Sequence, residues 1–76
     1  MQPQAMERRQ GENLRAAGAM LQSYLHGIDY PADKEGLRRT ARLNGAPDDV
    51  LRLIDRLPDR EYDYPTDVQQ EVGRVT

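Results

Sequence analysis

One five-residue phrase occurs twice in this chain and constrains how it can fold. Asp29-Tyr30-Pro31-Ala32-Asp33 precedes the middle of the 76 residues, and Asp63-Tyr64-Pro65-Thr66-Asp67 stands near the end. Proline fixes its own φ angle and drives the residue before it into an extended conformation. Each copy therefore predicts an extended tyrosine, a stop and the start of a helix, with Asp33 and Thr66 as N-cap residues. We expect the copies to lie side by side and to close the stretch between them into one domain.

Four stretches with apolar residues at helical spacing accompany the two copies. They predict helices over residues 13–25, 34–43 and 47–57, and a last helix that begins after Thr66 and runs to near the C-terminus. The third stretch has the most regular stripe, with Val50, Leu53 and Ile54 facing inward and Pro58 after it. In the last stretch, Gln69 follows Thr66 at the spacing of a capping box.

Two short extended pieces, residues 28–30 and 59–64, complete the predicted fold. A pair of strands this small is marginal alone and must rest on helices. The expected class is mainly α: a compact bundle of about four short helices with a small two-stranded β pair. Residues 1–12 are polar, carry proline and glycine, and predict a flexible N-terminal tail. Residues 13–76 are expected to form a single small helical domain.

The composition excludes several kinds of site and location. The chain has no cysteine, which excludes disulfides, zinc–thiolate sites and thiol catalysis. No apolar run reaches the length of a membrane span, and no hydrophobic segment follows Arg8-Arg9 as a signal peptide needs. We therefore expect a cytoplasmic protein without a membrane partner. The formal net charge of −2 supplies no general attraction for nucleic acid.

The chemically active side chains do not predict a catalytic or metal site. The only histidine has no second ligand or nucleophile at a useful spacing. Four carboxylates partly match a calcium-binding loop: Asp59, Glu61, Asp63 and Asp67. Tyr64 and Gln70, however, occupy the positions that need a glycine and a bidentate glutamate. We expect no catalytic residue, no metal ligand, no cofactor and no enzymatic activity.

A basic stripe is the first candidate interface. Lys34, Arg38 and Arg42 are four residues apart on the second predicted helix, with Arg39 nearby. Three interpretations remain open: charge balance on a solvated surface, a patch for an acidic protein partner, and contact with nucleic acid. The last would use the second and third helices as a helix-turn-helix-like pair. It is disfavoured because two acids in the first turn of the third helix would meet the phosphates.

The tyrosines supply a second candidate interface. Tyr24, Tyr30, Tyr62 and Tyr64 are the only aromatic residues, so they must provide the bulk of the core. We expect Tyr30 and Tyr62 in the core and Tyr64 on the surface. Tyr64 could then anchor an interface, together with Met20 on the outer side of the first helix.

Three phrases of the sequence carry a resemblance to a known family. They are Tyr24-Leu25-His26-Gly27-Ile28-Asp29-Tyr30-Pro31-Ala32, Asn44-Gly45-Ala46-Pro47-Asp48-Asp49-Val50-Leu51 and Leu57-Pro58-Asp59-Arg60-Glu61-Tyr62-Asp63. Over about residues 21–73 the chain resembles a small bacterial family known as domain of unknown function twenty-seven ninety-five. Gly36 and Tyr64 depart from its pattern, which has a glutamate and a small residue there. The resemblance implies a small helical bacterial domain and brings no catalytic residue or cofactor.

The functional expectation is a non-enzymatic module for protein interaction, through a protein partner or self-association. The candidate interface residues are Lys34, Arg38, Arg42, Met20 and Tyr64. The alternative is a nucleic-acid-binding protein that uses the basic second helix.

Overall fold

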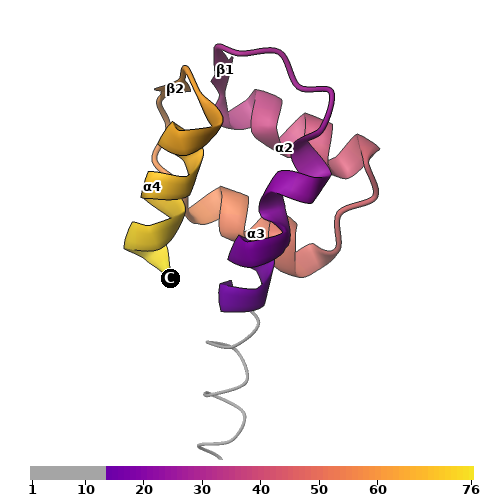
Figure 1. Cartoon of the computed structure of the whole chain (residues 1–76). Coiled ribbons are helices and arrows are strands. Elements are labelled where there is room, and N and C mark those ends of the chain that lie inside the picture. The colour runs from indigo at the N-terminus through magenta and orange to yellow at the C-terminus, as the bar shows by residue number, and fades with distance from the viewer. Residues whose placement is uncertain (1–13) are drawn as a thin grey trace, which may run out of the picture.

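The computed structural model describes residues 14–76, which form helical segments around one small sheet (Figure 1). In chain order the elements are an α-helix over residues 14–20 with the 3₁₀-helix η1 (Leu21–Leu25) directly after it, β1 (Ala32–Asp33), α2 (Lys34–Leu43), α3 (Asp48–Arg56), β2 (Glu61–Tyr62) and α4 (Pro65–Val75). The predicted fold class, a helical bundle with a two-stranded β pair, is confirmed. The predicted tail lies outside the described residues.

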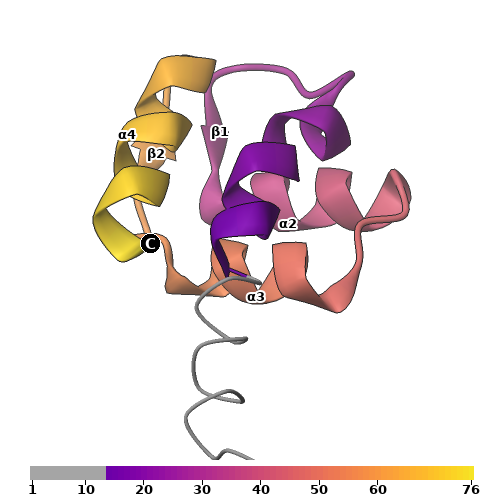
Figure 2. The same cartoon turned by 60° about the horizontal axis from the view of Figure 1, so that its bottom comes forward.

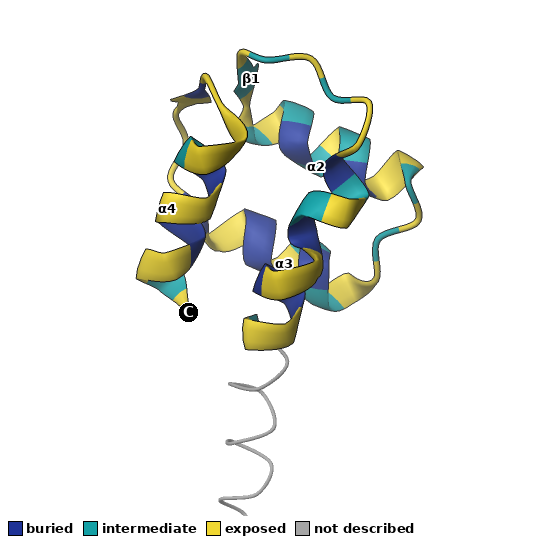
Figure 3. Cartoon of the chain, viewed as in Figure 1, coloured by how far each residue is buried: buried dark blue, intermediate teal, exposed yellow. Residues whose placement is uncertain are grey.

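The helices surround one central core. Figures 1 and 2 show α3 along one side of the molecule, α4 on another, and the helical segment over residues 14–25 next to α2. The buried faces of these helices point toward the middle (Figure 3). The buried apolar residues are Ala17, Leu21, Leu25, Leu37, Ala41, Val50, Leu53, Ile54, Leu57, Tyr62, Val68 and Val72. The inward stripes predicted from helical spacing are therefore confirmed.

The turn between α2 and α3 also holds the end of η1. Gly45 has a φ angle of +81°, the left-handed conformation that glycine adopts without strain. The side-chain amide of Asn44 donates to the Tyr24 carbonyl at 2.8 Å and to the His26 carbonyl at 3.0 Å. These carbonyls lie at the end of a helix, where the backbone offers them no partner. Asn44 thereby ties the first helical segment to the α2–α3 turn.

Gly18 packs closely against α4 and α3. A Cβ atom built on Gly18 would lie 3.0 Å from Cγ1 of Val72 and 3.9 Å from Cδ2 of Leu53. A glycine weakens a helix by about 1 kcal/mol relative to alanine. The close packing explains why the helix nevertheless carries a glycine at this position.

The first strand lies later in the chain than predicted, whereas β2 lies within the predicted residues 59–64. β1 pairs with β2 in antiparallel orientation, with Ala32 opposite Tyr62 and Asp33 opposite Glu61. The prediction placed the first strand at residues 28–30, before Pro31, and is wrong. Proline has no N–H to donate to a ladder, so pairing begins after it. The start of α2 at Lys34 then limits the strand to two residues.

Tyr62 links the sheet to α4. Its side chain is fully buried, and its hydroxyl donates to the Pro58 carbonyl at 2.7 Å. The guanidinium of Arg60 lies 5.0 Å from the centre of the Tyr62 ring, a distance at which a cation and an aromatic face attract. Nη1 of Arg60 also lies 3.2 Å from Oε2 of Glu71, a buried carboxylate on α4. The same arginine thus contacts both elements.

The other tyrosines divide between the core and the surface. Tyr30, predicted in the core, is half-buried and packs against it, and its buried hydroxyl has no hydrogen-bond partner within residues 14–76. Tyr64 is 66% exposed, which confirms the prediction for this residue.

The two copies of the repeated phrase have different local structures. Oδ1 of Asp33 accepts from the Gly36 N–H at 2.8 Å, which confirms Asp33 as the N-cap of α2. The prediction for Thr66 is wrong, because α4 begins at Pro65 and Tyr64 occupies the N-cap position. Proline fits the first helical position, where an N–H would have no partner. Oδ2 of Asp67 instead accepts from the N–H groups of Asp63, at 3.1 Å, and Tyr64, at 3.2 Å.

A pair of glycine substitutions tests the contact at Gly18. Gly73→Ala is expected to raise the free energy of unfolding by up to about 1 kcal/mol, because nothing lies within 4 Å of the added Cβ and alanine favours helix. Gly18→Ala is expected to lower it, because Val72 is β-branched and cannot move aside freely. Chemical denaturation of both variants measures the difference. An equal gain at both positions would contradict the close contact.

Three alanine substitutions test the helix caps. Asp33→Ala and Asp67→Ala are each expected to lower the free energy of unfolding by about 1 kcal/mol, because each removes an acceptor for unpaired N–H groups. Thr66→Ala is the control and should change it by less than about 0.5 kcal/mol, since Thr66 is exposed within α4. Thermal or urea unfolding gives all three values. A larger effect at Thr66 than at Asp67 would refute this assignment.

The buried tyrosines predict a loss of stability at alkaline pH. Burial raises the pKa of Tyr30, and burial together with the charge of Glu71 raises the pKa of Tyr62, above the ordinary value of 10.0. Above about pH 10 the unfolded chain therefore releases protons that the folded chain retains, and the free energy of unfolding falls. Urea unfolding between about pH 8 and pH 11 measures the slope of the free energy of unfolding against pH. Tyr30→Phe should reduce the slope, and an unchanged slope would show that Tyr30 makes no contribution.

Candidate functional site

The outer face of α2 gathers positive charge and one exposed apolar side chain. α2 buries Leu37 and Ala41. Residues three or four positions apart share a side of a helix. The opposite side carries a shallow hollow of about 340 Å³, lined by Glu35, Arg38, Arg39, Arg42 and Leu43. We call these five residues the basic face. Leu43 is 81% exposed, more than Met20 or Tyr64.

The predicted basic stripe divides into two parts. Nζ of Lys34 donates to the Asp55 carbonyl at 2.7 Å, and Nη1 of Arg38 lies 2.8 Å from Oδ1 of Asp55. These contacts join the start of α2 to the end of α3. The Arg38–Asp55 pair is partly exposed, so its contribution to stability is small, about 0–1 kcal/mol. Lys34 does not line the hollow, whereas Arg38 both lines it and holds Asp55.

Arg39 and Arg42 are the cations of the basic face that remain available. No carboxylate within the described range of the chain lies at ion-pair distance from either guanidinium. Arg39 was noted beside the predicted stripe, but the helical rotation places it within the basic face. Leu43 was missed. Its signal was present in the sequence, because position 43 lies outside the apolar period of Leu37 and Ala41.

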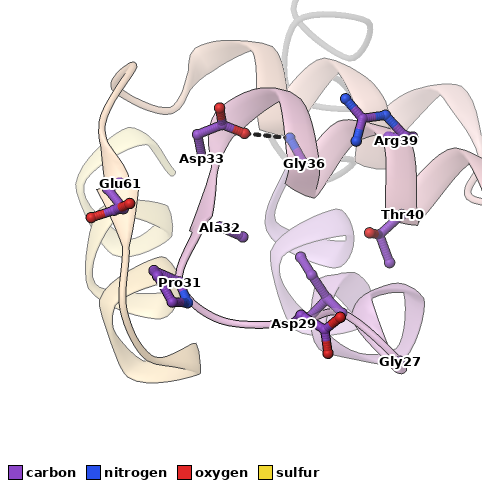
Figure 4. A pocket seen from close by; sticks show the side chains of 10 residues that line it. Gly27, Asp29, Pro31, Ala32, Asp33, Gly36, Arg39, Thr40 and Glu61 are labelled. Carbon is purple, nitrogen blue, oxygen red and sulfur yellow. Dashed lines mark hydrogen bonds between the residues drawn. The ribbon is translucent and has the colours of Figure 1, made fainter.

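A second hollow adjoins the basic face. It has a volume of about 430 Å³ and is lined by Gly27, Ile28, Asp29, Pro31, Ala32, Asp33, Gly36, Arg39, Thr40 and Glu61. We call it the loop groove. Figure 4 shows β1 between Glu61 on one side and the α2 residues Gly36, Arg39 and Thr40 on the other, with the loop from Pro31 to Gly27 running below α2. Because Arg39 lines both hollows, they meet along α2.

The remaining predicted interface residues lie elsewhere. Met20 is 44% exposed at the end of the first α-helix, and Tyr64 stands at the start of α4. Neither lines the basic face or the loop groove. The side-chain amide of Gln22 donates to the Pro65 carbonyl at 3.3 Å, which places the start of α4 beside η1. The five predicted residues therefore do not form one surface.

Residues 14–76 contain neither a cluster of metal ligands nor a helix that could span a membrane. Across residues 14–76, no three His, Cys, Asp or Glu side chains are placed together as ligands for a metal ion. In the part of the chain that the structure describes, no helix has both the length and the apolar character needed to cross a bilayer.

Comparison with known proteins identifies a family. No curated protein and no solved structure matches the chain. The model of a family described as protein of unknown function, DUF2795, matches residues 17–69. That range includes β1, α2, α3 and β2, and is more than half of the chain. The chain therefore belongs to the DUF2795 family.

Proposed function

We propose that this chain is a non-enzymatic protein-interaction module that binds an acidic protein segment through the basic face of α2. The observation that carries the proposal is the gathering of Arg38, Arg39, Arg42 and the exposed Leu43 on one side of a helix. The other side of that helix is fixed in the core.

The chemistry of these side chains favours a protein partner. Arginine binds carboxylates through two parallel hydrogen bonds and is enriched at interfaces. Arg39 and Arg42 have no competing ion pair within residues 14–76, so binding a carboxylate would not break an existing one. An exposed leucine alone is ordinary on a protein surface. Beside Arg39 and Arg42 it provides an apolar contact next to charged ones, and interfaces commonly combine an apolar centre with a polar rim.

A second candidate is nucleic-acid binding, which the basic α2 and its short connection to α3 favour. Phosphates would be attracted to the same arginines. The first turn of α3 carries Asp48 and Asp49, and Glu35 lies on the basic face itself. These three carboxylates would repel phosphates, so a protein partner is the better fit.

Binding of labelled peptides to the full chain tests the proposal. The probes are synthetic peptides in which acidic residues flank a leucine or an aromatic residue, with glutamine-substituted versions as neutral controls. Fluorescence anisotropy is expected to give salt-sensitive binding to acidic peptides. Arg42→Glu should weaken it by about tenfold or more, because a like charge then faces the peptide. Leu43→Ser should weaken it with less effect on the salt dependence.

Arg52→Glu is the matched control, because it makes the same charge change at an exposed position on α3. This variant should bind the peptides with an affinity within about twofold of the wild-type value, because salt screens the interaction between charges that lie far apart on the surface. Absence of binding by every acidic peptide, or equal loss in Arg52→Glu, would refute the proposal. A labelled DNA duplex that bound more tightly than any peptide would favour the second candidate.

A further inference from the structure

The loop groove is complementary in charge to the basic face. Asp29, Asp33 and Glu61 line it, and Arg39 is its only cation. Asp33 uses Oδ1 to cap α2, whereas no cation within residues 14–76 lies at ion-pair distance from Asp29 or Glu61. On the basic face, three arginines accompany one glutamate. One side of the molecule therefore carries an acidic hollow and a basic hollow next to each other.

The sheet register makes the acidic hollow unfavourable while it is uncovered. Asp33 and Glu61 are direct cross-strand partners, and both are exposed. Like charges in this arrangement destabilise a strand pair. A cation placed over Glu61 would reduce that repulsion.

The two hollows also carry apolar groups that could contact each other between two copies. Ile28, Pro31 and Ala32 contribute apolar surface to the loop groove. Leu43 projects from the adjoining basic face and is 81% exposed. A leucine that enters such a groove is removed from water, and so is the apolar surface that it covers. Both removals favour binding.

We infer that the acidic partner of the basic face is a second copy of this chain, with Arg42 and Leu43 of each copy docked in the loop groove of the other. This inference rests on the proposed function and identifies its acidic partner as the loop groove of the second copy, which carries Asp29 and Glu61. A two-fold contact between identical chains requires each copy to supply both halves of a self-complementary patch. The two hollows meet at Arg39, so one contact covers both. If the two hollows lay on opposite sides of the molecule, each copy would bind two others head to tail, and the copies would form an open filament instead.

Charge reversal in pairs tests this contact. Sedimentation velocity of the full chain over a concentration series is expected to show a reversible monomer–dimer equilibrium that weakens with salt. Arg42→Glu and Glu61→Arg should each weaken dimerisation at least about tenfold, since each places like charges together twice in the dimer. An equimolar mixture of the two variants should restore it to near the wild-type level. In the mixed dimer, one contact joins the two substituted positions, whose charges are opposite but exchanged. The other contact joins the native Arg42 of one variant to the native Glu61 of the other.

The controls separate the contact from the fold. Arg52→Glu changes the charge equally and should dimerise as the wild type does. All three substituted positions are exposed, so the variants should retain the wild-type circular dichroism. If a charge-reversed variant loses its fold, Arg42→Gln and Glu61→Gln replace the pair, and both should weaken dimerisation where Arg52→Gln does not.

Three results would overturn the inference: a monomer at every concentration, equal dimerisation of all variants, or failure of the mixture to restore the dimer. The proposed function is tested separately, by peptide binding at concentrations where the chain is monomeric. A monomer that binds acidic peptides would refute only the second copy as partner. A dimer that binds no acidic peptide would refute binding of acidic peptide segments, and would restrict the partner of the basic face to the folded loop groove of another copy.

Discussion

Burial of Tyr62 is the constraint on which the small sheet depends. The chain has no phenylalanine or tryptophan, and Tyr62 heads the fully buried side chains in volume. A pair of two-residue strands cannot persist by its own hydrogen bonds. The Tyr62 ring fixes β2 on the core, the Pro58 carbonyl satisfies its hydroxyl, and Arg60 joins its outer side to Glu71 of α4. β1 then pairs with β2, and α4 is joined to it through Arg60 and Glu71.

One side of α2 packs in the core, and its other side is exposed and available for binding. Leu37 and Ala41 enter the core, and Lys34 and Arg38 hold Asp55 at the end of α3. These contacts fix the helix, so the arginines and Leu43 project from a rigid element. A surface held in this way loses little backbone entropy on binding. The sheet then places Glu61 beside the same helix, which brings acidic groups next to basic ones.

The repeated Asp-Tyr-Pro-x-Asp phrase illustrates the limit of local rules. Its first copy ends in the N-cap of α2, and its second copy begins α4 at the proline itself. The rules for proline allow both outcomes, because proline suits the first helical turn and also favours an extended residue before it. The elements before the two copies differ. Tyr62 ends β2 just before the second copy, and α4 starts at the third position of that copy, whereas α2 starts directly after the first copy.

The sequence by itself determined the helices, their inward stripes, the Asp33 cap and the exposure of Tyr64, because helical periodicity and capping act over a few residues. It also indicated a basic second helix. Only the tertiary structure decided the position of the first strand and the contact at Gly18. It also decided that Lys34 and Arg38 bind Asp55 and that two hollows meet at Arg39. These features join residues far apart in the chain. No local pattern encodes them, because they follow from how the helices fill the space around one core.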